Sequence, residues 1–135
     1  NPAATDDAFV DGWLRTGDLA VVDDEGYLRI VDRLKDMFIS GGENVYPAEV
    51  EEAIHTHPAI AECAVVAVPD ERWGEVGRAV VNLKEGASLG ETELLDHLDG
   101  RLARYKIPRS VLVVRELPHN ASGKLVKSRV KEMHE

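Results

Sequence analysis

Three short segments combine glycines with charged side chains, which are residue types that nucleotide and phosphate sites use. They are residues 12–18, 40–44 and 117–124. The pair Gly123-Lys124 is typical of phosphate-binding P-loops, but such a loop needs a glycine five residues before its second glycine. Pro118 occupies that position. A P-loop is therefore excluded, and each segment taken alone is also typical of an ordinary turn.

Metal-dependent and thiol-dependent chemistry finds no support in the sequence. The five histidines are scattered without the spacing of a zinc site, so no metal site is predicted. Two of them, His119 and His134, are expected in exposed segments. Cys63 is the single cysteine, which excludes an internal disulfide. It begins an apolar run over residues 63–68, and this predicts a small buried side chain and not a reactive thiol.

Charge and composition narrow the class of protein. The net charge of -9 disfavours sequence-independent nucleic-acid binding, which depends on Lys and Arg at phosphates. Apolar residues make up 44% and charged residues 30%, as in ordinary globular proteins. No apolar run approaches the length of a membrane helix, and residues 1–7 lack the features of a signal peptide. We therefore expect a cytoplasmic protein without a membrane span. Since the chain does not start with Met, a fragment or a processed product is expected.

The elements of the first third are short strands. Residues 13–16 and 19–22 are rich in apolar side chains, residues 23–26 are typical of a hairpin turn, and residues 27–32 alternate polar and apolar side chains. Strands of this extent have no partner layer and cannot bury a core alone. We therefore interpret residues 1–33 as the last β segment of a larger domain.

The remaining residues, 34–135, predict a separate α+β body. A short strand over 37–39 leads into the glycine segment, and Pro47 suits the first turn of a helix that His57-Pro58 ends. The apolar spacing predicts a second helix over 91–102. Lys124 onward is expected to be a short, charged, helical tail. The expected fold is a three-stranded sheet, flanked by helices and joined by a short hairpin, with strands at 61–68, 78–83 and 110–114.

The motifs of this sequence resemble, in order and separation, the adenylate-forming superfamily of acyl- and aryl-CoA synthetases, luciferases and peptide-synthetase adenylation domains. The resemblance covers nearly the whole chain and rests on the segments GWLRTGD at 12–18, RLKD at 33–36, SGGENVYPAEVE at 40–51 and LPHNASGK at 117–124. It implies that residues 34–135 are the C-terminal lid domain of an AMP-forming carboxylate–CoA ligase. The large N-terminal domain would be missing.

The resemblance also implies a reaction in two steps. A carboxylate attacks the α-phosphate of ATP, supplied as Mg-ATP, to give an acyl-adenylate and pyrophosphate. The thiol of CoA then displaces AMP, and the small domain rotates between the two steps. The Mg²⁺ would be held mainly by the missing domain, which would also hold the carboxylic acid.

Four residues match the positions that, in the family, contact the ribose, form the hinge or assist the adenylation step. Asp18 and Arg33 match two ribose contacts, although a turn-capping Asp and a solvated strand-end Arg are the ordinary interpretations. Lys35 matches the hinge, where a residue must tolerate a large change of φ and ψ. Lys124 matches the lysine of the adenylation step, in an electrostatic role and not as a base. Lys35 and Lys124 are otherwise simple surface lysines.

Six further residues match the CoA-binding positions. The glycine pair at 41–42 matches a pantetheine tunnel, where a backbone without Cβ leaves room for a thin arm. The resemblance implies that Glu43 shapes that loop and that Trp73 lies beside the pantetheine. It also implies that Tyr105 stacks on the adenine and that Lys106 contacts a phosphate of CoA. Ile107 stands where some relatives carry an arginine, which departs from the basic pattern. The predicted CoA-binding residues are Gly41, Gly42, Glu43, Trp73, Tyr105 and Lys106.

Other functions stay open at this point. The glycine segment resembles that of CoA ligases more than that of peptide-synthetase domains, while a luciferase-like oxygenase is also compatible with these residues. A different class of hypothesis is a standalone CoA- or nucleotide-binding module, or an inactive chain that dimerises or exchanges its N-terminal strands. The isolated chain is expected to be inactive.

Overall fold

The structure is a computed structural model that describes residues 1–133, so His134 lies outside the described part of the chain. The chain divides into two compact units, Asn1–Asp36 and Met37–Glu135, which we call the first and the second unit. The division falls shortly after the boundary expected between residues 33 and 34. Each unit is described by itself.

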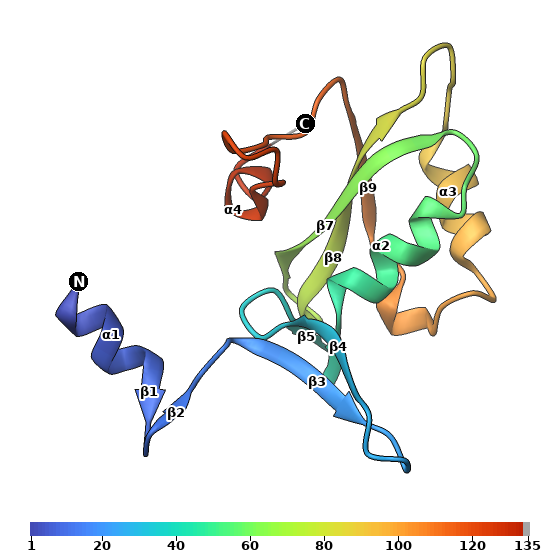
Figure 1. The fold of residues 1–135 in the computed structure, drawn as a ribbon. Helices are drawn as coiled ribbons and strands as arrows, with labels where there is room; N and C mark the ends of the chain where they lie inside the picture. The colour runs from blue at the N-terminus through green and yellow to red at the C-terminus, as the bar shows by residue number, and fades with distance from the viewer. Residues whose placement is uncertain (134–135) are drawn as a thin grey trace. The chain divides into compact units, whose positions relative to one another are not determined.

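The first unit is a helix followed by two separate two-stranded antiparallel sheets (Figure 1). The helix was not predicted, and it starts because the Asn1 side chain accepts from the Ala4 N–H and a proline follows. The turn expected over 23–26 is present, since Asp23 Oδ1 accepts from the N–H of Tyr27 at 2.8 Å. The elements are α1 (Pro2–Ala8), β1 (Phe9–Val10), β2 (Trp13–Leu14), β3 (Asp18–Val22) and β4 (Leu28–Arg33).

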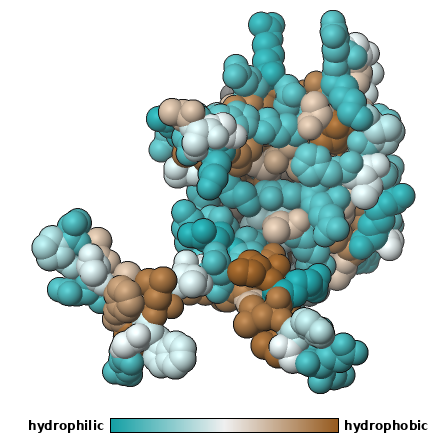
Figure 2. Space-filling model, viewed as in Figure 1, coloured by the Kyte–Doolittle hydropathy of each residue, from teal (hydrophilic) through white to brown (hydrophobic). Residues whose placement is uncertain are grey.

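Large apolar side chains reach the surface throughout the first unit. Trp13 is 80% exposed, Tyr27 71% and Leu28 66%. Figure 2 shows strongly hydrophobic atoms, in brown, at the surface of both small sheets, whereas tryptophan and tyrosine are pale on this scale. Its one buried residue among those described is Asp32. The first unit therefore has no apolar core of its own, as the sequence predicted for residues 1–33.

The second unit is built on a five-stranded mixed sheet. The strands run in the order β6-β5-β8-β7. Strand β9 pairs parallel to β8 on the edge of β8 that faces away from β7, the same edge that β5 joins. Its elements are β5 (Phe38–Ser40), β6 (Glu43–Val45), α2 (Pro47–His55), β7 (Ile60–Asp70), β8 (Gly74–Leu83), α3 (Glu91–Leu98), the 3₁₀ turn η1 (Arg104–Lys106), β9 (Ser110–Val114) and α4 (Lys127–Val130).

The prediction of a three-stranded sheet with a short hairpin is confirmed in part, because the hairpin extends the sheet to five strands. The expected strands β7, β8 and β9 are present, but the hairpin β5–β6 joins them through the pair Ser40↔Gly74. Strand pairing between residues this far apart leaves no trace in local apolar spacing. The α+β class itself is confirmed, as are the helix that begins at Pro47 and the strand Ser110–Val114.

The core lies on both faces of the sheet. Alternating β7 residues face opposite sides, so that Val65 belongs to one buried cluster and Val66 to the other. Helices α2 and α3 cover the first face, where Ile54 and Leu98 are fully buried. Figure 1 shows α4 on the other side of β7 from these helices. This confirms the interpretation of β7 as a strand buried on both faces.

Helix α3 ends four residues earlier than predicted. The apolar spacing continues to Leu102, but the helix stops at Leu98. Asp99 already has an extended backbone, with a ψ of 132°, and Gly100 then has a left-handed φ of +78°, so the helix cannot continue. Leu102 still packs against the core, and a β-bridge joins its backbone to that of Asp99. Apolar spacing therefore marked a core contact correctly and the helix end incorrectly.

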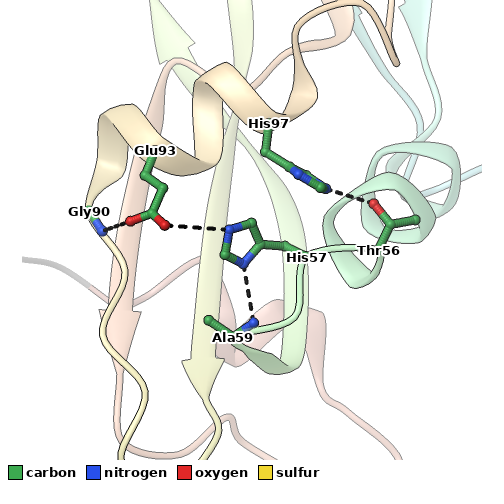
Figure 3. Close-up of polar contacts among 6 residues, drawn as sticks. All are labelled: Thr56, His57, Ala59, Gly90, Glu93 and His97. Carbon is green, nitrogen blue, oxygen red and sulfur yellow. Dashed lines mark hydrogen bonds and ion pairs between the residues drawn. The ribbon is translucent and has the colours of Figure 1, made fainter.

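A polar cluster joins the end of α2 to α3 (Figure 3). The rings of His57 and His97 meet edge to face with centroids 4.8 Å apart. Thr56 Oγ1 lies 2.7 Å from His97 Nε2, and His57 Nδ1 accepts from the Ala59 N–H at 3.2 Å. Burial, with smaller contributions from Arg101 and His57, lowers the pKa of His97.

This lowered pKa predicts a pH-dependent stability. A histidine whose pKa is lower when folded binds fewer protons in the folded chain, so stability falls as pH drops through about 6.5. We expect His97→Gln to make the unfolding free energy less dependent on pH below 7, as measured by urea denaturation at several pH values. The exposed Thr92→Gln on the same helix should keep the original slope. Identical slopes in wild type and His97→Gln would contradict the expectation.

Candidate functional site

The segment that carries Lys124 is a tight turn organised by one side chain. Asn120 Oδ1 accepts hydrogen bonds from the N–H of Ser122 at 3.0 Å and of Lys124 at 2.9 Å. The Gly123 N–H donates to the Asn120 carbonyl at 2.9 Å, with a φ of +78° at Gly123. A side-chain oxygen that bonds several following donors fixes a turn without help from another element. The turn therefore presents the exposed Lys124 on an ordered backbone.

Asp18 and Arg33 form an ion pair within the first unit. They stand opposite each other in the β3–β4 ladder, and Arg33 Nε lies 3.1 Å from Asp18 Oδ1. A shallow hollow of about 280 Å³ adjoins them and is lined by Gly17, Arg33, Leu34 and Lys35. The structure thus brings the two predicted ribose contacts together, beside a small hollow.

Lys35 lies in the turn that follows β4. The Asp36 N–H donates to the Arg33 carbonyl at 3.0 Å and closes this turn. The division between the two units follows directly after Asp36. The predicted hinge residue is therefore next to the position where one compact unit gives way to the other in the sequence.

Gly41 and Gly42 form the turn of the β5–β6 hairpin. Their φ angles are +59° and +90°, so both occupy the left-handed region that favours glycine in a two-residue hairpin turn. Glu43 follows directly, paired with Ser40 at the first rung of the hairpin. A Cβ on Gly41 would lie 2.6 Å from Trp73 Cε3, closer than carbon atoms can approach. Only glycine at position 41 allows this approach of the Trp73 ring.

Trp73 is held by the loop between β7 and β8. Asp70 Oδ1 accepts from the N–H of Trp73 at 2.8 Å, and the Trp73 carbonyl accepts from the Gly41 N–H at 3.0 Å. The guanidinium carbons of Arg72 and Arg109 lie 4.8 and 5.8 Å from the ring centroid. Cations over an indole face are attracted by the ring and hold its orientation. The structure therefore joins Gly41 and Trp73, which the sequence predicted to share a site.

A groove of about 730 Å³ extends from Trp73 along the second unit. Tyr105, the predicted adenine-stacking residue, lines it with 40% of its surface exposed. Two acidic residues, Asp96 and Asp99, line it from the α3 side, and Arg104 and Arg109 contribute positive charge. These two arginines were not predicted from the sequence, because only the fold brings them into the groove that Trp73 lines.

Lys106 is engaged by another side chain. Its Nζ contacts both carboxylate oxygens of Glu49, at 2.7 and 2.8 Å. This hydrogen-bonded pairing raises the pKa of Lys106. The predicted phosphate contact of Lys106 stays a prediction, and it would require the Glu49 pair to be shared or broken. Arg104 and Arg109 are cations that line the groove itself.

Cys63 takes no part in these arrangements. It is 6% exposed, and burial, followed by the nearby Glu51 carboxylate, raises its pKa to about 12. A thiol with this pKa stays protonated at neutral pH and is a poor nucleophile. The prediction of a small buried side chain is confirmed.

Two further findings concern residues 1–133. Nowhere in this range do three or more His, Cys, Asp or Glu side chains gather in a way that could hold a metal ion. Every helix described is too short or too polar to cross a bilayer.

Comparison with known proteins identifies the family. The model of the AMP-binding enzyme C-terminal domain matches residues 49–124, more than half of the chain. The chain is 52% identical over 130 residues to a feruloyl-CoA synthase of Amycolatopsis, covering 96% of this chain and 26% of that protein. It is 49% identical over 133 residues to a long-chain-fatty-acid–CoA ligase of Mycobacterium tuberculosis, covering 98% and 26%.

Solved structures agree with this result. The o-succinylbenzoate CoA synthetase of Bacillus subtilis in complex with its acyl-adenylate intermediate is 46% identical, with a TM-score of 0.86 over 96% of this chain and 26% of that one. The same enzyme with ATP and magnesium is 44% identical, with a TM-score of 0.88 over 97% and 27%. The chain thus spans about a quarter of the length of the relatives it matches. It belongs to the AMP-binding enzyme C-terminal domain family, the domain that acyl- and aryl-CoA ligases carry.

Proposed function

We propose that this chain is the C-terminal part of an ATP-dependent carboxylate–CoA ligase of the fatty-acid or acyl-CoA synthetase type. The enzyme forms an acyl-adenylate from Mg-ATP and then an acyl-CoA thioester. Residues 1–33 would complete a large N-terminal domain of the same polypeptide, and residues 34–135 would be its mobile lid. The relatives support this assignment, because they are CoA ligases about four times as long as the stretch they share with this chain.

One observation carries the proposal of domain alternation. The Lys124 turn is tied to Glu62 near the start of β7, while Gly41 and Trp73 lie at the loop that follows Asp70, the last residue of β7. Eight residue steps separate Glu62 from Asp70, about 26 Å of strand. The anchor of the Lys124 turn and the Gly41–Trp73 site therefore stand near opposite ends of one hairpin. A lid that moves between the two steps would bring each of them to the reacting atoms in turn.

The residues then take distinct roles in the two steps. Asp18 and Arg33 hold the ribose of the nucleotide, and Lys124 offsets the negative charge that develops as pyrophosphate leaves. Gly41, Gly42 and Glu43 line the path of the pantetheine, Trp73 flanks it, and Lys35 is the pivot. The adenosine end of CoA then lies along the groove of Tyr105, where Arg104 and Arg109 can balance its phosphates. Lys106 supports this groove from its pair with Glu49.

A pair of assays tests the proposal. We expect a polypeptide that contains this chain together with the large domain to catalyse ATP–pyrophosphate exchange with at least one acid from a panel of fatty and aryl acids. It should also consume CoA thiol when CoA is added. The 135-residue chain alone should give no exchange with any acid, because it lacks the site for the acid. Exchange catalysed by the purified chain alone would contradict the two-domain assignment.

The exposed apolar side chains of the first unit favour a second property of the isolated chain. Without a covering domain, Trp13, Leu28 and Ile30 would seek another apolar surface or strand edge. This supports dimerisation or strand exchange by the chain alone. A role as a standalone CoA- or nucleotide-binding module, or in another branch of the superfamily, would be separated from the ligase assignment by the CoA-consumption assay.

A further inference from the structure

The position of the Lys124 ammonium depends on contacts outside its own turn. The hydrogen bonds that Asn120 Oδ1 accepts fix the shape of residues 120–124, and those found within residues 1–133 all stay inside the turn. The segment enters the core at Leu117 and returns to it at Val130, both 1% exposed. Between these two anchors Leu125 packs, partly buried, against the same core cluster, and polar contacts add to it in fixing where the turn stands relative to the second unit.

One such contact lies at the base of the turn. His119 Nε2 is 2.6 Å from Glu62 Oε1, and both side chains are about one-third exposed, at 30% and 37%. His119 also faces Leu125 in an antiparallel bridge, so the two residues that flank residues 120–124 are joined to each other. The short bond to Glu62 therefore fixes the whole base of the turn to β7.

A second contact lies on the other side of Lys124 in the sequence. Lys127 Nζ is 2.8 Å from Glu51 Oε1, and the same oxygen accepts from the N–H of Val65 at 2.8 Å. Glu51 thus satisfies a donor on the outer edge of β7 as well as holding the start of α4. Loss of Glu51 would disturb the sheet edge itself, whereas the described contacts of the Glu62 carboxylate go to the turn.

We propose that Glu62, acting through His119, is a positioning residue for Lys124 in the adenylation step, an inference that rests on the proposed function. The ammonium must reach the α-phosphate region in another domain, and Lys124 has a long stem whose origin is set by this turn. Small misplacements of a charged group lower the rate steeply, by roughly 10²-fold for about 1 Å. The thioester step uses the other end of the β7–β8 hairpin and does not depend on this contact.

The test uses the full polypeptide and measures both half-reactions. We expect Glu62→Ala to lower the rate constant of adenylate formation by about tenfold, while thioester formation from preformed adenylate changes less than about twofold. The control Glu52→Ala removes the same charge from an exposed site on α2 and should leave both rates unchanged. Glu62→Gln keeps an acceptor oxygen for His119 and should recover most of the adenylation rate. A purely structural role would lower both half-reactions together, because both need the folded unit.

A double-mutant cycle separates the remaining outcomes. If Glu62 acts through His119, the double variant Glu62→Ala/His119→Ala loses no more adenylation rate than the worse single variant. Additive losses, equal losses in both half-reactions, or no loss in Glu62→Ala would each overturn the inference while leaving the proposed function intact. Lys124→Ala is measured in parallel. If that variant forms adenylate normally, the role proposed for Lys124 fails, and this inference fails with it, whereas the ligase assignment is tested separately by the exchange and CoA-consumption assays.

Discussion

Replacing Lys124 with alanine in the full polypeptide is expected to slow adenylate formation by about 10²–10³-fold, the cost of losing one well-placed electrostatic contact in a transition state. Thioester formation from a preformed adenylate should proceed at an unchanged rate. The reason is geometric: the Lys124 turn is tied to Glu62 near the start of β7, about 26 Å of strand from the loop that carries Trp73. Single-turnover measurements of pyrophosphate release and of thioester formation separate the two steps.

The control for this prediction is Lys131→Ala. It removes the same charge from an exposed position just after α4 and should leave both half-reactions at their original rates. Lys124→Arg keeps the charge but replaces a compact ammonium by a planar guanidinium, and we expect only partial recovery. Equal losses of both half-reactions in Lys124→Ala would refute an adenylation role.

Gly41→Ala is expected to have the opposite selectivity, slowing thioester formation by about 10²-fold and sparing adenylation. The new Cβ would lie 2.6 Å from Trp73 Cε3, so the ring must retreat by about 1 Å to reach ordinary carbon contact. A displacement of this size at a substrate-positioning group costs roughly 10²-fold. The φ of +59° at Gly41 adds about 1 kcal/mol of backbone strain.

Gly86→Ala separates the two causes. Gly86 has a φ of +73° and nothing within 4 Å of an added Cβ, so alanine there introduces backbone strain without a clash. Both half-reactions should be retained in that variant, with a small loss of thermal stability. If Gly41→Ala forms thioester normally, or loses both steps equally, the assignment of the glycine turn to the CoA step is wrong.

Local sequence patterns predicted most of the helices and strands, but they did not predict where helix α3 ends. The helix at Pro47 and the strand Ser110–Val114 follow from a start signal and from a short apolar run, both contained within a few residues. The end of α3 at Leu98 comes from the extended backbone of Asp99 followed by the left-handed Gly100, and the apolar spacing continues to Leu102 without marking this break. Side-chain spacing reports burial more reliably than it reports where a helix stops.

In the candidate site, residues within the motifs were predicted from the sequence, whereas contacts between residues far apart in the sequence were not. Motif order placed Asp18 with Arg33 and Gly41 with Trp73, and the structure brings both pairs together. The arginines around Trp73 and the partner of Lys106 were not predicted. Lys106 and Glu49 are 57 residues apart, and such a pair follows from strand order and helix packing, not from any local motif. Sequence patterns therefore located the candidate residues, but they did not predict which charged side chains pair with them or lie beside them.

The protonated and buried Cys63 has a practical consequence for following the lid in solution. As the chain's one native thiol it reacts poorly with maleimides, so a cysteine introduced at an exposed loop position such as Glu85→Cys would be the favoured attachment point for a dye. Cys63 could then stay in place, and its packing against the sheet would not be disturbed. In a polypeptide that also contains the large domain, fluorescence energy transfer to a donor on that domain would test the proposed reorientation of the second unit.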